Sequence, residues 1–505
     1  MTVNAHAKSS AGAIYADERA ALHRVPTDLY IGGEWRPASG GGTLPVEDPS
    51  TAQTLIEVAD ATPADALAAL AAATEAQASW AATAPRERGE ILRRAYELLL
   101  ERADELALVM TLEMGKALAE SRAEIVYAAE FLRWFSEEAV RIHGRFMTNT
   151  TGVGRILTMR QPVGPCVFVT PWNFPTAMGT RKIAPAIAAG CTMVVKPAQQ
   201  TPLSMLALAR VLAEAGLPGG VLNVICAHHS GAVIEPLLRD PRTRKLSFTG
   251  STEVGRTLIA QSAQQILRVS MELGGNAPFI VFEDADLDAA VEGALTAKLR
   301  NVGEACTAAN RFHVHESIAD EFARRMAARM AQLKVGRGTD PGVDVGPLID
   351  ERQRTIVAEI VADATDRGAT VLTGGEPRLS PTQSAHPGYF FEPTVLTGVP
   401  PDARALREEI FGPVAPVATF SDEQQALAAA NSTEYGLVAY LYTRDLARAF
   451  RVTEGIEAGM VGVNQGIVSN PAAPFGGVKQ SGFGREGGFE GIEEYLETKY
   501  VALAV

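Results

Sequence analysis

The stretch Lys245-Leu-Ser-Phe-Thr-Gly-Ser-Thr-Glu-Val-Gly255 contains the pattern that determines the fold class. Its first five residues are typical of a buried strand, and Gly250 to Gly255 lead into a helix. The same succession precedes it, with strands predicted at 163–170, 192–195 and 221–225 and helices at 178–189 and 202–215. Strands joined through helices predict a parallel sheet, with ligands bound beyond the carboxyl ends of its strands. The Gly250 turn is spaced like a phosphate-binding turn but lacks the middle glycine of that motif.

A second alternation of strand and helix begins at Ala277. It contains a strand at 278–282, helices at 287–299, 317–333 and 351–367, and strands near Thr370 and Thr394. Three prolines between Glu376 and Gly388 predict a surface loop. The repetition predicts two α/β domains that share a cleft.

The two ends of the chain follow other patterns. Residues up to about Val25 are interpreted as a loosely held extension, and 28–36 as two short strands around a glycine turn. The region 62–146 has helical periodicity, with Pro63 and Pro85 at helix starts. The stretch 155–160 is interpreted as an edge strand that another subunit can pair with. The apolar tail also ends in a strand, which needs a neighbour and so suggests oligomerisation.

Composition excludes several classes of protein. The 505 residues favour two to four domains, and the net charge of -13 disfavours binding to nucleic acid or to an anionic membrane. No apolar run approaches the roughly 20 residues that span a bilayer. The N-terminus lacks the apolar core of a secretory signal, and four cysteines without a C-x-x-C pair predict neither disulfides nor a zinc site. The histidine pairs 228/229 and 313/315 also lack metal-site spacing. A cytoplasmic protein is the simplest expectation.

One cysteine differs from the other three. Cys306 lies in Arg300-Asn-Val-Gly-Glu-Ala-Cys-Thr-Ala-Ala-Asn310, among turn-forming and small residues. Cys166, Cys191 and Cys226 lie in apolar runs and are expected to be core residues. From this window alone, a nucleophile and a structural thiol remain equally open for Cys306.

Seven short windows, taken together and in this order, resemble the aldehyde dehydrogenase superfamily over nearly the whole chain. The windows are Pro171-Trp-Asn-Phe-Pro175, Lys196-Pro-Ala198, Phe248-Thr-Gly-Ser251, Glu272-Leu-Gly-Gly275, the Cys306 window, Glu408-Glu-Ile-Phe-Gly-Pro413 and Pro474-Phe-Gly-Gly477. The residues around Glu272 and the stretch 484–493 read much as in the succinate-semialdehyde dehydrogenase branch. The resemblance implies an N-terminal extension (1–25), a cofactor-binding domain (26–144 and 164–274), a catalytic domain (275–485) and a β-hairpin oligomerisation arm (145–163 and 486–505).

The resemblance also implies a mechanism, in which an aldehyde is oxidised through a covalent thioester. Cys306 would add to the carbonyl carbon, and the side-chain amide of Asn173 with the Cys306 backbone N–H would stabilise the oxyanion. Glu272 would activate water for release of the acid, and Lys182 would assist proton relay. By themselves, Asn173 reads as a turn residue, Glu272 as a surface carboxylate and Lys182 as a solvated lysine; the joint match favours the catalytic roles for the first two and leaves Lys182 open.

For the cofactor, the resemblance places Lys196 at the adenosine ribose, Gly250 and Ser251 at the pyrophosphate, and Glu409 and Phe411 at the nicotinamide end. The other residues implied are Thr170, Pro171, Trp172, Pro197, Ala198, Gly220, Gly255 and Leu273. Relatives that prefer NAD usually have glutamate at the position of Gln199, which repels a 2′-phosphate. Neutral Gln199 therefore favours NADP, with NAD tolerated.

For the substrate, the branch holds a distal carboxylate with two arginines and a serine, which correspond to Arg181, Arg300 and Ser469. This implies a small carboxylated aldehyde, succinate semialdehyde, with glutarate semialdehyde as the alternative because one methylene changes binding by only about 1–3 kcal/mol. A CoA-acylating enzyme and a non-catalytic protein of the same fold are the further alternatives, and intact Glu272 and Cys306 argue against them. Glu304, two residues before Cys306, would raise the thiol pKa if it pointed inward. A homo-oligomer, dimer or tetramer, is expected.

Overall fold

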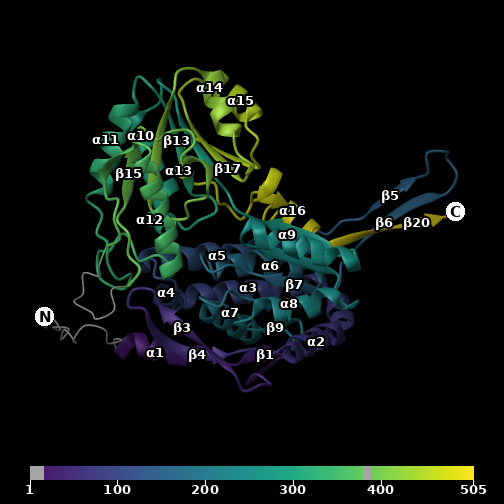
Figure 1. Cartoon of the computed structure of the whole chain (residues 1–505). Helices are drawn as coiled ribbons and strands as arrows, with labels where there is room; N and C mark the ends of the chain where they lie inside the picture. Colours follow the sequence, from purple (N-terminus) through teal and green to yellow (C-terminus); the bar gives the residue numbers. More distant parts are fainter. Residues whose placement is uncertain (1–15, 379–387, 505) are drawn as a thin grey trace, which may run out of the picture.

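The first of two large sheets forms the lower half of the molecule in Figure 1. The computed structural model describes residues 16–378 and 388–504. The eight strands of this sheet, in spatial order, are β19 (Gly482–Phe483), β11 (Arg268–Glu272), β10 (Lys245–Thr249), β7 (Cys166–Val169), β8 (Met193–Lys196), β9 (Leu222–Val224), β1 (Leu29–Ile31) and β2 (Glu34–Arg36). The five central strands, β11 to β9, are parallel.

The helices cover both faces of this sheet, as a parallel sheet requires. Alternate residues of each strand face opposite sides: Phe168 of β7 packs with one set of helices and its neighbour Val167 with the other. The first set is α3 (Pro85–Glu101), α4 (Ala103–Met114), α5 (Leu118–Glu138), α6 (Ala177–Ala189) and α7 (Pro202–Glu214). The second set is α2 (Pro63–Ala82), α8 (Ser230–Arg239) and α9 (Thr252–Ser262).

Several helix boundaries confirm the sequence expectations. Pro63 and Pro85 are the first residues of α2 and α3, and Thr62 caps α2 by accepting a hydrogen bond from the Asp65 N–H. Gly190 ends α6 in a left-handed conformation, with φ of 92°. Two buried carboxylates from neighbouring helices cap α6 and α7. Glu124 accepts hydrogen bonds from backbone N–H groups at the start of α6, and Glu113 does the same for α7.

The second sheet forms the upper half of the molecule. Its strands, in spatial order, are β14 (Thr370–Thr373), β15 (Thr394–Thr397), β16 (Val414–Phe420), β13 (Ala309–His315), β12 (Ala277–Val281), β17 (Val438–Tyr442) and β18 (Met460–Val463). All neighbours are parallel except β14 and β15. Its helices are α10 (Leu287–Leu299), α11 (Ala319–Met330), α12 (Glu351–Asp366), α13 (Arg404–Arg407), α14 (Glu423–Asn431) and α15 (Leu446–Gly455). The two-sheet α/β architecture predicted from the sequence is therefore confirmed.

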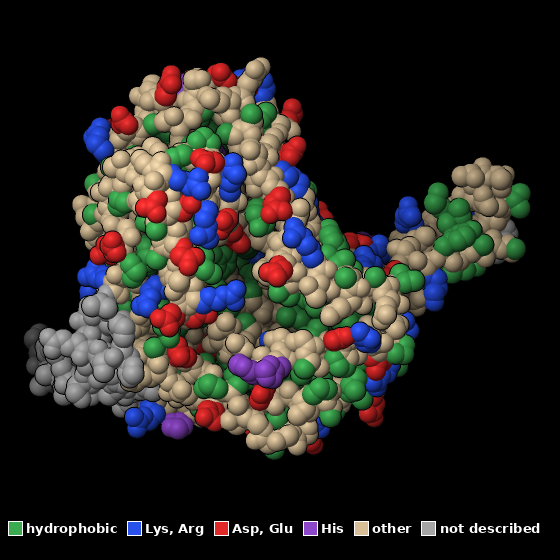
Figure 2. Space-filling model, viewed as in Figure 1, with side chains coloured by type: hydrophobic (Ala, Val, Ile, Leu, Met, Phe, Trp, Pro, Cys, Tyr) green, Lys and Arg blue, Asp and Glu red, His purple; other side chains and the backbone are tan. Residues whose placement is uncertain are grey.

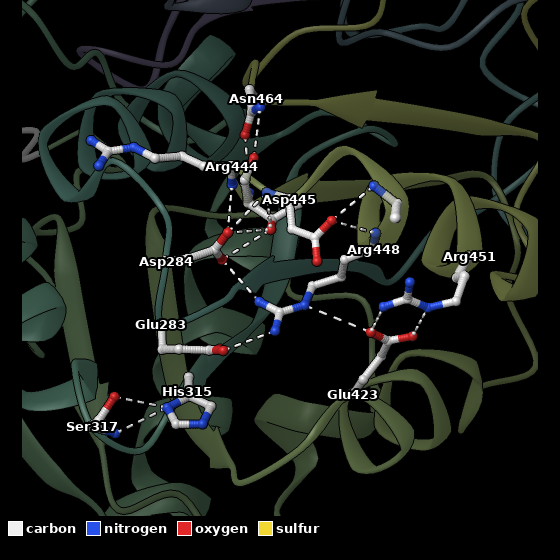
Figure 3. Close-up of polar contacts among 12 residues, drawn as sticks. Glu283, Asp284, His315, Ser317, Glu423, Arg444, Asp445, Arg448, Arg451 and Asn464 are labelled. Carbon is white, nitrogen blue, oxygen red and sulfur yellow. Dashed lines mark hydrogen bonds and ion pairs between the residues drawn. The ribbon is translucent and has the colours of Figure 1, made fainter.

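Ion pairs fill the carboxyl edge of this second sheet (Figure 3). Asp284, just after β12, accepts hydrogen bonds from the Thr443 hydroxyl and from the backbone of Arg444. Arg448 of α15 binds Asp284 at 2.9 Å and Glu283 at 2.8 Å. These ion pairs join α15 to the loop after β12.

A three-stranded sheet projects from the body (Figure 1). It consists of β5 (Arg145–Thr148), β6 (Arg155–Pro162) and β20 (Leu496–Leu503), with β6 in the middle. The expectation that 155–160 forms an edge strand is therefore wrong, because the C-terminal tail pairs with it along its full length. The open edges belong to β5 and β20. A short helix, α16 (Glu490–Glu493), precedes β20.

The N-terminal extension also differs from expectation. Residues 16–25 are not loosely held: α1 (Ala16–Arg24) buries Leu22, and Val25 after it is also buried. Glu18 pairs with Arg337 of the upper half at 2.9 Å. Residues 1–15, and most of the loop expected at 376–388, lie outside the described residues. None of the helices within the described ranges is long and apolar enough to cross a membrane.

Further strands were not predicted from the sequence. A two-stranded hairpin, β3 (Thr43–Asp48) with β4 (Gln53–Ala59), lies at the bottom of the molecule in Figure 1. Strands β11, β13 and β16 to β18 were also missed. In addition, β19 belongs to the first sheet although the expected boundary assigned 482–483 to the catalytic domain.

Candidate active site

A cavity of about 380 Å³ lies where the carboxyl edge of the first sheet meets the amino edge of the second. In Figure 2 the surface is hollowed between the two halves of the molecule. The cavity is lined by residues that follow β7, β10 and β11, by residues that precede β13 and β16, and by the start of α12. Those predicted for the site are Pro171, Trp172, Asn173, Gly250, Ser251, Glu272, Leu273, Cys306, Glu409 and Phe411.

The loop that leads to Cys306 has an unusual backbone. Asn301, Val302 and Gly303 all have positive φ, of 53°, 58° and 81°. A β-branched residue such as Val302 is a genuine outlier in this region, and such strain occurs at functional sites. A side chain at Gly303 would collide with the Gly412 carbonyl oxygen, so the position requires glycine. The loop therefore holds Cys306 in one defined place at the cavity wall.

Asn173 and the cysteine loop are joined by reciprocal hydrogen bonds. The Asn173 amide donates to the Glu304 carbonyl oxygen at 3.0 Å, and the Asn301 amide donates to the Asn173 carbonyl oxygen at 3.0 Å. The Glu304 side chain points away from Cys306 and accepts a hydrogen bond from the Ile349 N–H at 3.1 Å. Burial raises the pKa of the Glu304 carboxyl well above its usual range. Glu304 is not among the main causes of the elevated pKa of the Cys306 thiol.

A buried ion pair, Lys116 with Glu124, is hydrogen-bonded to the backbone of Asn173. Lys116 donates to the Asn173 carbonyl oxygen at 2.7 Å and to the Glu124 carboxylate at 2.6 Å. Both side chains are 1% exposed. Because Glu124 also caps α6, the pair joins α4 and α5 to the segment that carries Asn173. The sequence analysis missed both residues, since a lysine and a glutamate in helical sequence give no signal of burial.

Burial controls the ionisation of the two central groups. Cys306 is half-buried, and its surroundings raise the pKa of the thiol to about 12, although Arg181 acts in the opposite direction. Burial and the nearby carboxylate of Glu486 raise the pKa of Glu272 well above its usual range. One carboxyl oxygen of Glu272 has no hydrogen-bond partner among the described residues. A thiol and a carboxyl group therefore line one cavity, and burial favours the protonated form of each.

Glu486 holds the two adjacent cations of α6. It pairs with Arg181 at 3.0 Å and with Lys182, whose ammonium group also donates to the Ser247 hydroxyl at 3.1 Å. Lys182 is fully buried and is not among the cavity-lining residues. The expectation of a solvated lysine is therefore wrong. Lys182 acts electrostatically on Glu272 and is not among the main charges that act on the Cys306 thiol. The sequence analysis did not identify Glu486.

The predicted cofactor residues fall into two groups. At the nicotinamide end, Trp172 and Phe411 pack edge to face at 5.4 Å, and Glu409 accepts a hydrogen bond from the Gly275 N–H at 3.0 Å. Burial raises the pKa of Glu409 to about 7. Ser251 caps α9 and lies at the positive end of its dipole.

The second group lies at the end of β8, outside the cavity lining. It contains Lys196, Pro197, Ala198 and Gln199, with Thr170 on the neighbouring strand end. Lys196 donates to the Ser230 hydroxyl at 2.5 Å, and burial lowers its pKa to about 8.

Two of the predicted glycines have packing roles. A side chain at Gly255 would meet Leu273 at 2.5 Å, so this glycine lets α9 pack on the residue after β11. Gly220 is wrongly placed by the sequence analysis. It lies against Ala72 and Ala76 of α2 and lines a different cavity.

The site fits a dinucleotide. The hydroxyls of Thr170 and Thr249 are buried and have no hydrogen-bond partner in the described part of the chain, which suits a polar ligand at this edge. The start of α12 adds residues that the sequence analysis missed. Arg352 is exposed at the cavity, and Gln353 donates to the Phe411 carbonyl oxygen at 2.9 Å.

The predicted substrate residues also lie beside Cys306. Arg300 donates to the Ser469 hydroxyl at 3.1 Å, and its guanidinium group lies 4.7 Å from the Phe174 ring centre. Arg181 is 2% exposed and stacks on Phe475 at 3.7 Å. Both arginines act electrostatically on the Cys306 thiol. Neither guanidinium group points into bulk solvent.

Comparison with known proteins identifies the family. The model of the aldehyde dehydrogenase family matches residues 35–501. The chain belongs to the aldehyde dehydrogenase family. A succinate-semialdehyde dehydrogenase from Paenarthrobacter nicotinovorans is 60% identical over 426 residues, 84% of this chain and 93% of the relative.

Two other relatives of the family are about as long as this chain. A glutarate-semialdehyde dehydrogenase from Pseudomonas aeruginosa is 50% identical over 474 residues, 94% of this chain and 97% of the relative. The crystal structure of an NADP-dependent enzyme from E. coli is 49% identical, covers 96% of this chain and 99% of its own, and has a TM-score of 0.92. The resemblance recognised in the sequence is therefore confirmed. No cluster of three or more metal-ligating side chains occurs within residues 16–378 and 388–504.

Proposed function

We propose that the protein oxidises succinate semialdehyde to succinate with NADP as hydride acceptor. The observation that carries this proposal is the position of Arg300 and Ser469, which are hydrogen-bonded to each other at 3.1 Å beside the Cys306 loop. A carboxylate at the far end of a short aldehyde would accept hydrogen bonds from both groups. The 60% identity to a succinate-semialdehyde dehydrogenase supports the same substrate.

Cys306 acts as the nucleophile. After the thiol has given its proton to the charged form of Glu272, its sulfur attacks the aldehyde carbon, and the Asn173 amide and the Cys306 backbone N–H stabilise the resulting alkoxide. The Asn173 amide needs one N–H free for this role, because the other donates to Glu304. A bound cofactor would supply the hydride acceptor for this adduct, which would leave a thioester on Cys306.

Glu272 acts as the base that activates water for hydrolysis of the thioester. Burial raises the pKa of Glu272 and so disfavours its charged form, and the Glu486 carboxylate beside it acts in the same direction. Lys182 and Arg181 act in the opposite direction by stabilising the charged form. The pKa of Glu272 therefore depends on burial and Glu486, which raise it, and on nearby cations, which lower it.

Lys196 and Gln199 bind the adenosine end of the cofactor. Lys196 supplies a cation for a 2′-phosphate, and neutral Gln199 does not repel it. The E. coli relative, whose structure is described as NADP-dependent, supports this preference. Arg352 would counter the negative charge of the diphosphate at the cavity mouth.

Glutarate semialdehyde is the second candidate substrate, because a relative that is 50% identical acts on it by name. The decisive experiment compares kcat/KM for succinate semialdehyde, glutarate semialdehyde and butanal, which lacks the carboxylate, with NADP and with NAD. A preference for succinate semialdehyde of at least about 100-fold over butanal is expected. Equal kcat/KM values for succinate semialdehyde and butanal would disprove the carboxylate site. A large preference for glutarate semialdehyde would make that aldehyde the proposed substrate instead. Formation of acyl-CoA on addition of CoA would indicate the acylating reaction.

The projecting sheet of β5, β6 and β20 supports assembly with further copies of the chain. Phe146 is 66% exposed on β5 and Tyr500 is 60% exposed on β20, beside open strand edges. Light scattering of the full chain and of a Phe146→Asp variant tests this proposal. A monomeric wild-type protein would contradict it.

A further inference from the structure

Two aromatic rings on one face of α5 contact both predicted substrate arginines. Tyr127 and Phe131 lie one helical turn apart on this helix, and their rings pack edge to face at 5.0 Å. The guanidinium group of Arg300 lies 5.6 Å from the Tyr127 ring centre, and that of Arg181 lies 5.7 Å from the Phe131 ring centre. The two cations, which come from different segments of the chain, are therefore brought together over adjacent rings (α5 in Figure 1).

Two polar atoms in this arrangement lack partners. The Tyr127 hydroxyl is buried and makes no hydrogen bond to any residue that the structure describes. The same holds for Nη2 of Arg181, although its Nε faces Glu486. Buried donors are normally paired, and a binding site that pairs them only with its substrate discriminates strongly against analogues without the acceptor.

The charges around these atoms favour an anion. On α6, Arg181 and Lys182 both pair with Glu486, and the carboxyl group of Glu272 is also near them. Arg300 forms no ion pair within the described ranges and is held by the Ser469 hydroxyl instead. The carboxyl groups of Glu272 and Glu120 lie near these cations, but burial raises the pKa of each and so favours its neutral form, which leaves the arginines available to an anion.

The walls beside Tyr127 are apolar. Tyr127 packs against a small cluster that contains Phe174, Met178, Ala305 and Ala308, next to the nucleophile. Such walls fit the methylene chain of a short aldehyde and limit water at its far end. The aldehyde carbon would then face Cys306 while the opposite end of the substrate lies over α5.

We propose that the Tyr127 hydroxyl donates a hydrogen bond to the distal carboxylate of the substrate, together with Arg300, Arg181 and Ser469. Tyr127 would thus add a second neutral hydroxyl donor beside that of Ser469, on α5 of the cofactor-binding half. The proposal rests on the proposed function, since it requires a substrate with a terminal carboxylate.

The test is the Tyr127→Phe variant, which removes only the hydroxyl. We expect kcat/KM for succinate semialdehyde to fall about tenfold and that for butanal to stay within about twofold. Binding of succinate, measured by calorimetry without turnover, should weaken by a similar factor. The melting temperature should not fall, because the hydroxyl has no partner to lose in the unliganded protein.

Tyr440→Phe is the matched control. Its hydroxyl is also buried near the nucleophile but donates to the Thr307 carbonyl oxygen at 2.9 Å. Its loss should lower the melting temperature and affect both aldehydes alike. If Tyr127→Phe behaves in the same way, or leaves succinate binding unchanged, the inference is wrong. If the wild-type enzyme does not distinguish succinate semialdehyde from butanal, the proposed function fails instead.

Discussion

Replacement of Lys116 by methionine tests how the oxyanion donor is positioned. The side chain is retained in length, but its bonds to the Asn173 carbonyl oxygen and to Glu124 are lost. Both partners of the pair are 1% exposed, so solvent cannot replace the lost interaction. Breaking such a buried pair costs about 3–5 kcal/mol of stability, because the remaining carboxylate stays buried. We expect a loss of this order in chemical denaturation.

The effect on catalysis has a separate upper limit. Complete loss of one oxyanion donor lowers kcat by about 10²–10³-fold. Because the Asn301 amide still holds the same carbonyl oxygen of Asn173, Lys116→Met should lower kcat by about 10- to 100-fold. The KM for the cofactor should change little, since Lys116 lies away from the strand ends that hold it.

A double-mutant cycle separates positioning from general damage. If Lys116 acts through Asn173, then Lys116→Met should have no further effect on kcat in an Asn173→Ala background. Glu113→Ala is the control, because it removes the equivalent cap from α7, a helix that carries no proposed catalytic residue. It should lower stability while kcat stays within about twofold. Multiplicative effects of the Lys116 and Asn173 changes would refute the reasoning.

Three further predictions concern the cofactor and the nucleophile. Gln199→Glu should weaken NADP binding relative to NAD by about tenfold in fluorescence titrations, and an unchanged ratio would remove Gln199 from the adenosine site. The pKa of Lys196 is lowered to about 8, so its charge is lost as pH rises through that value, and the affinity for NADP relative to NAD should fall above about pH 8. Lys196→Arg should keep the ratio constant there. The pKa of Cys306 is raised to about 12, so its alkylation by iodoacetamide without cofactor should accelerate about tenfold per pH unit between about pH 7 and pH 10. A plateau near pH 8 would contradict the effect of burial.

Local signals in the sequence were enough for much of the fold. Proline at the starts of α2 and α3 and glycine after α6 gave boundaries that the structure confirms. Strand β13 was missed although residues 311–315 alternate between polar and apolar, a pattern typical of a strand whose polar side faces solvent, whereas here both sides are buried. In the structure Arg311 is buried, and its guanidinium group is satisfied by the carbonyl oxygens of Asn276, Ala429 and Ala430. Such compensation comes from distant segments and leaves no local pattern.

The candidate site shows the same limit. Motifs indicated Cys306, Glu272 and Asn173, which do line one cavity. The groups that set their geometry and charge, such as Lys116 and Glu486, come from other elements and were missed. Their roles depend on contacts with residues that are distant in the sequence. A single sequence does not show which distant side chains the fold brings into contact.

The backbone before Cys306 has a consequence for how activity is lost on heating. Left-handed Val302 makes the native loop less stable by about 1–3 kcal/mol, and only contacts such as the bond from the Asn301 N–H to Glu120 oppose its relaxation. A segment of this kind opens at a lower free energy than the sheets around it. The thiol should therefore lose its alignment while both halves of the molecule are still folded, so that thermal inactivation precedes melting.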